Sequence, residues 1–374
     1  MDSGFYVAAV PFHVALVTVA LWVGMRAARR DRLDAPLGGW LVRLCADLLL
    51  LGAVAAVAAA LCALFVSDPL FAGIRMLSQM LFGELVVLSG WMAAVHAYSG
   101  RPARALLPAA LASTLVAVYW DAYHREPQEL VVRHHTLERR HDGRTARHLR
   151  IVHLTDIQSE EVGAHEQLAL EEALRQKPDL VVFTGDYAVN EQAAADLRRL
   201  LQRVHFTAPL GVYAVPGDVP DDGPAIFGGL GVTWLEDQHV RVTRPDGGSI
   251  VLVGLSTPMS RTTDPRALRR LIESAPAADL RIVLGHAPDF VAELAGHGSV
   301  DLALAGHTHG GQIVLPLFGP PLTLTRLPRR YAGDLNDYQG TPLHVSRGIG
   351  MERGTAPRVR FLCPPEVCVL DVTY

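Results

Sequence analysis

Apolar segments that end in Asp or His recur along the second half of the chain, and this pattern restricts the fold more than any other feature. Five segments have the length and the β-branched content of buried strands: LRIVHLTD, DLVVFTGDY, GVYAVPGD, LRIVLGHAPD and VDLALAGHTHGG. SIVLVGLS is a sixth segment of the same series. Helical periodicity is found between the first two, in EQLALEEALRQ. Strands that alternate with helices build a sheet covered by helices, so the sequence predicts an α/β fold.

The polar residues at these strand ends are expected to meet in space. In α/β sheets the carboxyl ends of the strands line one crevice, so residues distant in sequence converge there. Carboxylates and imidazoles gathered in this way are ligands for Mn, Fe or Zn and are too rich in nitrogen for a calcium site. A single His at a strand end is more often structural, but six positions in five loops favour a metal site. They are Asp156, Asp186, Asp218, His286, His307 and His309.

The motifs at these positions have a family resemblance. The order TDIQ, TGDY, PGDV, GHAPD and GHTHGGQI resembles the five motifs of the calcineurin-like metallophosphoesterases, over about residues 125 to 374. The family pattern is Asp-x-His, Gly-Asp, Gly-Asn-His, Gly-His and Gly-His-x-His. The tail, in which SRGIG and RFLCPPEV follow GHTHGGQI, is similar to a membrane-associated bacterial branch that acts outside the cytoplasm.

The resemblance implies a four-layer α/β/β/α sandwich that holds two divalent metal ions, Mn, Fe or Zn. Asp186 would bridge the ions, with Asp156 and His309 completing one and His286 and His307, with residue 218, completing the other. A hydroxide held between the ions would attack phosphorus in line while the cations neutralise phosphoryl charge. The catalytic residues would be Asp186 and Asp218, and the metal ligands Asp156, Gln158, Asp186, Asp218, His286, His307 and His309.

Three residues depart from the family pattern. Gln158 stands where the family has a His, and a neutral amide oxygen is a weaker ligand than an imidazole. Asp218 replaces an Asn and adds a negative charge, which would offset part of that loss and favours a rebalanced site. Val219 replaces a His that donates a proton to the leaving oxygen or stabilises the phosphoryl group, and such help is worth about 10²- to 10⁴-fold.

Two functions stay open after these substitutions. The first is a metal-dependent phosphoesterase that hydrolyses a phosphodiester or pyrophosphate bond, in which His165, His344 or Arg347 is a candidate to replace the missing acid. The second is a non-catalytic relative that binds or senses a phosphorylated ligand. Arg347 is also a candidate for bidentate contact with a substrate phosphate. His153, in the strand before the first motif, is interpreted as a packing residue.

The first third of the chain has a different composition. Hydrophobic residues make up 50% of the whole sequence, and apolar runs cover 5–25, 41–66, 76–97 and 103–120. Each is near the roughly 20 residues that cross a bilayer as a helix. The first lacks the features of a removable signal peptide. We therefore predict an all-α membrane domain of four transmembrane helices over 1–122 and a calcineurin-like phosphoesterase domain over 123–374.

Basic residues predict on which side of the membrane the phosphoesterase domain lies. RAARRDR follows the first span, and Arg101 and Arg104 lie between the third and fourth, so both basic loops share the side that the charge rule makes cytoplasmic. The domain is then external, although the arginines after the fourth span oppose the rule. The predicted location is the bacterial inner membrane, and the predicted partners are the lipid bilayer and a phosphorylated small-molecule or lipid substrate.

The remaining features allow fewer conclusions. A net charge of -4 gives no reason to expect a nucleic-acid partner. The basic segment 121–150 is expected to form a solvated entry strand and hairpin, or to attract anionic lipid head groups. Residues 316–330, PLFGPPLTLTRLPRR, form either a hydrophobic lip that suits an amphiphilic substrate or an ordinary surface loop. Cys363 and Cys368 are either reduced or joined in a disulfide.

Overall fold

The computed structural model describes all of the chain except residues 1–68, 140–145, 220–222, 297, 353 and 355. The chain divides into two compact units. One ends at His124 and takes in the short segment 352–358. The other is formed by Arg125–Met351 and Val359–Tyr374 and contains both sheets.

Two long apolar helices make up the described part of the first unit. One runs over Leu70–Tyr98 and consists of α3 (Pro69–Gln79), a π-helical turn (Met80–Glu84) and α4 (Leu85–Tyr98). The second contains α5 (Pro102–Trp120) and continues to Gln128. Both are long and apolar enough to cross a membrane, and they contain the spans predicted at 76–97 and 103–120. The spans predicted at 5–25 and 41–66 lie outside the described residues.

Two six-stranded mixed sheets form the centre of the second unit. The first has the strand order β1 (Val131–Glu138), β12 (Glu366–Thr373), β2 (His148–Leu154), β3 (Leu180–Phe183), β4 (Val212–Ala214) and β5 (Val232–Trp234). The second has the order β10 (Asp334–Tyr338), β11 (Thr341–Val345), β9 (Leu302–Ala305), β8 (Leu280–Leu284), β7 (Ser249–Gly254) and β6 (Gln238–Thr243). The neighbouring strands β2, β3 and β4 are parallel, as are β7, β8 and β9.

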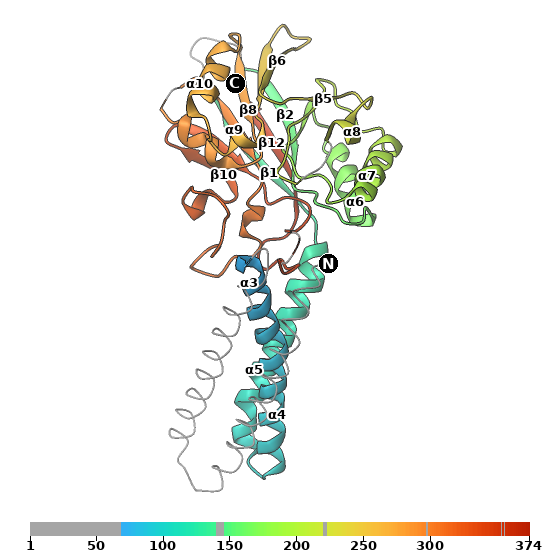
Figure 1. The fold of residues 1–374 in the computed structure, drawn as a ribbon, viewed down its shortest axis with the longest axis vertical. Coiled ribbons are helices and arrows are strands. Elements are labelled where there is room, and N and C mark those ends of the chain that lie inside the picture. Colours follow the sequence, from blue (N-terminus) through green and yellow to red (C-terminus); the bar gives the residue numbers. More distant parts are fainter. Residues whose placement is uncertain (1–68, 140–145, 220–222, 297, 353, 355) are drawn as a thin grey trace. The chain divides into compact units, whose positions relative to one another are not determined.

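Three hydrophobic cores show how the layers are stacked. Alternate residues of one strand enter different cores: Val152 packs with helical Leu170 and Leu197, whereas Ile151 packs with Leu252 of the second sheet. A third core joins the second sheet to its own helices. In Figure 1, α6 (Ala164–Arg175), α7 (Glu191–Arg203) and α8 (Gly223–Phe227) lie on one side of the strands, and α9 (Thr257–Ser260) and α10 (Pro265–Ser274) on the other. The predicted α/β fold is confirmed.

The prediction of a hairpin in the basic segment 121–150 is wrong. β1 and β2 do not pair, because the C-terminal strand β12 lies between them, parallel to β1 and antiparallel to β2. β12 carries apolar side chains on both faces, so it is buried by a layer on each side and belongs inside the sheet. β1 is an edge strand and carries Arg133, His134 and His135 of this segment, whereas Arg150 lies on β2.

Candidate metal centre

The site residues sit in short loops after parallel strands, in a backbone conformation that few side chains adopt. Asp156, Asp186, His307 and His309 have φ angles of 49°, 57°, 69° and 50°. These angles lie in the left-handed region, which is uncommon for residues other than Gly. Such strain costs about 1–3 kcal/mol per residue and is concentrated at functional sites. The loops therefore hold these side chains in positions that the rest of the fold imposes.

Glycines in the motifs let the loops approach one another. A Cβ atom on Gly217 would lie 2.1 Å from the backbone nitrogen of Asp186 and 2.2 Å from its Oδ1 atom. A Cβ atom on Gly306 would lie 2.1 Å from Thr155 Oγ1 and 2.3 Å from Asp156 Oδ2. Any larger residue at either position would push a predicted ligand out of place, so both glycines are required by close packing.

Hydrogen bonds fix the two buried carboxylates. Asp186 Oδ1 accepts from the backbone N–H groups of Asp218 and Val219 at 2.7 and 2.9 Å, and its Oδ2 accepts from Gln158 Nε2 at 2.6 Å. Asp156 accepts from the backbone N–H of His307, at 3.1 Å to Oδ1 and 3.0 Å to Oδ2. Both carboxylates are buried. Asp186 thus connects the first, second and third motifs directly.

The histidines each turn a ring nitrogen toward a carboxylate. His286 Nδ1 donates to the Thr184 carbonyl at 2.8 Å, and its Nε2 atom faces Asp186 Oδ1 at 3.4 Å and Asp218 Oδ1 at 3.7 Å. His307 Nδ1 lies 3.3 Å from Asp218 Oδ2, and His309 Nε2 lies 3.6 Å from Asp156 Oδ1. An imidazole held by a backbone carbonyl on one nitrogen is the usual arrangement of a metal ligand.

Several ligand atoms in the site have no hydrogen-bond partner within the described chain. They are His286 Nε2, both ring nitrogens of His309 and Gln158 Oε1, all buried. A buried polar atom without a partner costs about 1–3 kcal/mol, and a cation would satisfy lone pairs that point at carboxylates. Two groups of side chains have ligand atoms within 4.8 Å of one another: Asp156, Asp186 and His286, and Asp218, His286 and His307. The residues present therefore fit divalent metal ions.

Burial and crowded charge shift the pKa values of these groups. Burial raises the pKa of Asp156 to about 7, and the neighbouring Asp186 adds to the rise. For His286, burial acts to lower the pKa, but the carboxylates of Asp186, Asp218 and Asp156 outweigh it and raise the pKa to about 10. Burial lowers the pKa of His307 to about 4. Without an ion, the carboxylates thus keep a proton on His286, and a divalent cation bound at His286 Nε2 would take the place of that proton.

Arg261 is a site residue that the sequence analysis missed. Its guanidinium forms an ion pair with the Asp218 carboxylate and lies 3.2 Å from His307 Nε2. The positive charge offsets the extra negative charge of an Asp in the place of an Asn. The available signal was SIVLVGLS, the one segment of the series without Asp or His at its end, since Arg261 comes shortly after that strand.

A cavity of about 430 Å³ adjoins Arg261. It is lined by Arg261, Asp289 and the consecutive residues Pro321, Leu322, Thr323, Leu324, Thr325 and Arg326. The carbonyl of Leu324 lies 3.1 Å from His307 Nε2, so the cavity wall touches the candidate metal centre. The segment PLFGPPLTLTRLPRR therefore forms part of this wall.

Other residues named from the sequence make contacts with groups outside the predicted ligand set or carry no ligand atom. Arg347 pairs with Asp334 at 2.9 Å and donates its backbone N–H to Glu366, so its contact with a substrate stays a prediction. His165 Nε2 donates to the Ile349 carbonyl, and His344 is buried between the two sheets. Val219 is buried beside Asp186. Among the described residues, the buried Cys363 and Cys368 are free thiols, not a disulfide.

Comparison with known proteins assigns the chain to a family. Residues 149–311, which include all the predicted metal ligands, match the family described as Calcineurin-like phosphoesterase. The chain is 34% identical over 209 residues to the uncharacterized metallophosphoesterase YkuE of Bacillus subtilis, a match that covers 52% of this chain and 68% of the relative. It is 31% identical over 210 residues to the phosphodiesterase YaeI of Escherichia coli, covering 53% and 72%.

A third relative has a name that specifies a substrate. The chain is 27% identical over 201 residues to the UDP-2,3-diacylglucosamine pyrophosphatase LpxG of Chlamydia muridarum, and the match covers 50% of this chain and 57% of that protein. The motifs, the ligand geometry and these matches agree. The chain belongs to the calcineurin-like phosphoesterase family and is a metal-dependent phosphoric ester hydrolase.

Proposed function

We propose that the chain hydrolyses a phosphodiester or pyrophosphate bond of a lipid-linked substrate at a centre of two metal ions. The observation that carries the proposal is the pair of ligand groups that share His286, with buried lone pairs that lack hydrogen-bond partners within the described chain. Bound divalent cations supply charge neutralisation for the phosphoryl oxygens and activation of water.

The ligand assignment follows from contacts around Asp186. Asp156, Gln158 and His309 would hold the first ion: Gln158 donates to Asp186 Oδ2, and His309 Nε2 lies near Asp156. Asp218, His286 and His307 would hold the second, and their ligand atoms lie within 4.8 Å of one another. Asp186, whose two oxygens contact different motifs, would bridge the ions.

Arg261 is the residue proposed to stabilise the phosphoryl group in place of the family's third-motif His. The family's His is replaced by Val219, which has no proton to donate. Arg261 pairs with Asp218, the residue before that position, and its side chain is 42% exposed, so part of the guanidinium is accessible to a phosphoryl oxygen. An arginine stabilises developing negative charge without donating a proton.

The lipid-linked substrate is inferred from apolar surface and from relatives. Leu317 and Phe318 are exposed in the segment whose next residues line the cavity beside Arg261. A substrate with a phosphate and an acyl chain would use both surfaces. The name of LpxG states a diacylated sugar nucleotide and a pyrophosphate bond, and the name of YaeI states a phosphodiester bond. These names support the class of bond and of substrate.

The first test is turnover by the full-length protein purified in detergent. We expect metal analysis to find Mn, Fe or Zn, and we expect hydrolysis of an aryl phosphodiester and of a lipid-linked pyrophosphate in proportion to metal content. No turnover of either substrate at full metal occupancy would contradict the proposal. It would favour the non-catalytic relative that binds a phosphorylated ligand.

Replacing Arg261 with Met should lower kcat/KM by about 10²- to 10³-fold, the usual effect of removing one group that stabilises developing charge. Bound metal should be retained, because none of the predicted ligands changes. Arg269→Met is a matched control, since Arg269 lies on α10 and pairs with Glu293, which is not a predicted ligand. Unchanged kcat/KM in Arg261→Met would remove Arg261 from the proposed catalytic centre.

We further propose that residues 1–122 are a membrane domain of four helices that anchors an external phosphoesterase domain over 123–374. The two described helices support this, because only 28% and 11% of their apolar windows are buried, and Trp91, Leu106 and Trp120 are exposed. A core helix of a soluble protein would be mostly buried. The location would be the bacterial inner membrane.

Carbonate washing and protease treatment test this location. The protein should stay in the membrane pellet after an alkaline carbonate wash, because spanning helices are not released by breaking ionic contacts. Protease added outside spheroplasts should digest the phosphoesterase domain. Release by carbonate would contradict anchoring, whereas protection from the protease would contradict only the orientation.

A further inference from the structure

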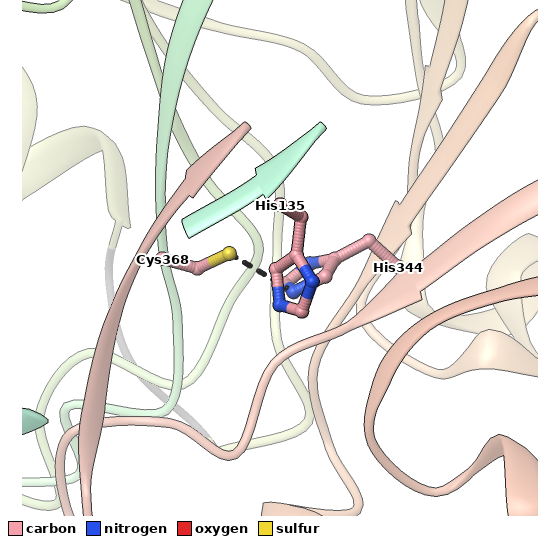
Figure 2. A group of neighbouring side chains, drawn as sticks. All are labelled: His135, His344 and Cys368. Carbon is pink, nitrogen blue, oxygen red and sulfur yellow. Dashed lines mark hydrogen bonds between the residues drawn. The ribbon is translucent and has the colours of Figure 1, made fainter. Parts of the chain in front are cut away.

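A second cluster of metal-binding side chains lies between the two sheets and takes no part in the proposed reaction. It consists of His135 on β1, His344 on β11 and Cys368 on β12 (Figure 2). His344 and Cys368 have no exposed surface, and Cys368 belongs to the hydrophobic core between the sheets. Two strands of the first sheet and one strand of the second thus supply one residue each.

The three residues are close enough to share one ion. One ligand atom from each lies within 4.8 Å of the others, and Cys368 Sγ lies 3.0 Å from His344 Nε2. In Figure 2 the two imidazole rings lie against each other and the sulfur faces them; the ring centroids are 5.1 Å apart. Bonds of about 2.0–2.3 Å around one ion place ligands about 3.5 Å apart. Small side-chain rotations would reach this geometry.

A second layer of hydrogen bonds orients His344. Its Nδ1 lies 3.0 Å from His153 Nδ1, and His153 Nε2 lies 2.8 Å from Thr184 Oγ1. When His344 Nδ1 donates to His153 and His153 Nε2 donates to Thr184, the His344 Nε2 lone pair faces Cys368. Metal-bound histidines are commonly held by a partner on the other ring nitrogen. His153 thus does more than the packing that the sequence suggested.

The surroundings favour an occupied site. His135 Nε2 is buried and has no hydrogen-bond partner among the described residues. His135, His153, His344 and Cys368 are polar side chains packed between two apolar sheets. Burying them is costly unless each polar atom has a hydrogen-bond partner or a metal ion. A bound cation would replace the thiol proton, which leaves to solvent.

We propose that His135, His344 and Cys368 form a second metal site that binds a thiolate-preferring ion, Zn²⁺ or Cu⁺, and joins the two sheets. Thiolate and imidazole ligands select these ions over Mn²⁺ and Mg²⁺, which prefer oxygen. The site would be structural, because it is buried and holds together strands from both sheets. Its ligands are distinct from those of the phosphoesterase centre, which contains no sulfur ligand in the predicted set.

Cobalt spectroscopy distinguishes this site from the phosphoesterase centre. We would use full-length protein in detergent in which Cys45, Cys62 and Cys363 are replaced by Ser, so that Cys368 is the sole thiol. Co²⁺ added to this protein after metal removal should give a near-ultraviolet thiolate-to-cobalt band at one equivalent. Adding Cys368→Ala should remove the band. Absence of the band in the protein with Cys368 alone would overturn the proposal.

Metal analysis provides a second and independent readout. Relative to the wild type, Cys368→Ala should lose one equivalent of zinc or copper and keep the metals of the phosphoesterase centre, whereas Asp186→Asn should show the reverse. Which element is lost decides between Zn²⁺ and Cu⁺. Should Cys368→Ala fail to fold, His135→Gln, on the edge strand, would be used in its place. Unchanged zinc and copper in a folded variant would also overturn the proposal.

Discussion

Asp186→Asn is expected to abolish metal binding at the phosphoesterase centre and, with it, all hydrolysis. The change removes the negative charge of the carboxylate that contacts three motifs, while the side-chain oxygen can still accept from the N–H groups of Asp218 and Val219. Loss of an outer-shell partner alone lowers metal affinity by about 10- to 100-fold, and loss of a bridging ligand should exceed this. Metal content and kcat/KM, measured on the same preparation, would show both effects.

The matched control for Asp186→Asn is Asp196→Asn. Asp196 lies on α7, on the surface, and pairs with Arg199 and Gln192 one turn away, so this variant makes the same chemical change outside the site. It should keep the metal content and activity of the wild type. Full metal occupancy in Asp186→Asn would contradict the bridging role, whatever the activity. If such a variant were also inactive, Asp186 would be a catalytic group that is not needed for metal binding.

The fold was predictable where the pattern is local. The strands in LRIVHLTD and DLVVFTGDY could be predicted from the sequence, because a short apolar run bounded by polar turns rarely forms anything else. The position of β12 in the sheet could not be predicted. It pairs with β1 and β2 across more than 200 residues, and no local feature of the C-terminal segment records which strands it separates. A basic segment with two strands looked like a hairpin because sequence neighbours usually pair.

The candidate site was predictable to the extent that its residues follow strands of one series. Asp156, Asp186, Asp218, His286 and His307 all come shortly after such strands, and the structure brings them together. Arg261 follows a strand too, but arginine is common on surfaces, and only the three-dimensional contact with Asp218 distinguishes it.

The cluster of His135, His344 and Cys368 between the sheets could not be predicted from the sequence, for a different reason. His344 and Cys368 are the only His or Cys on their strands, and His135 has only His134 beside it, so none has the spacing of a metal-binding motif. Their side chains meet because each faces the core between the sheets, and that depends on which face of each strand is turned inward. A shift of one residue in any of these strands would move its ligand to the opposite face.

Val219→His is expected to raise kcat about 10²- to 10⁴-fold for a substrate with a poor leaving group, since an imidazole restores a proton donor beside the metal ligands. The leaving group of an aryl phosphodiester is a stable phenolate that needs little protonation. The rate of aryl diester hydrolysis should therefore change far less. The ratio of alkyl to aryl diester hydrolysis, measured by steady-state kinetics across pH, is the informative quantity. A selective gain for the alkyl substrate would identify protonation as the step that the natural Val219 leaves unassisted.

The size of the new side chain must be separated from its acidity, because Val219 is 4% exposed and overpacking costs about 1–3 kcal/mol. Val219→Leu adds volume without a proton donor and should be no faster than the wild type on either substrate. If Val219→His and Val219→Leu have the same rates at unchanged metal content, the missing acid does not limit turnover. Combining each variant with Arg261→Met would then show whether Arg261 already stabilises the leaving group, because loss of the guanidinium should make the histidine beneficial.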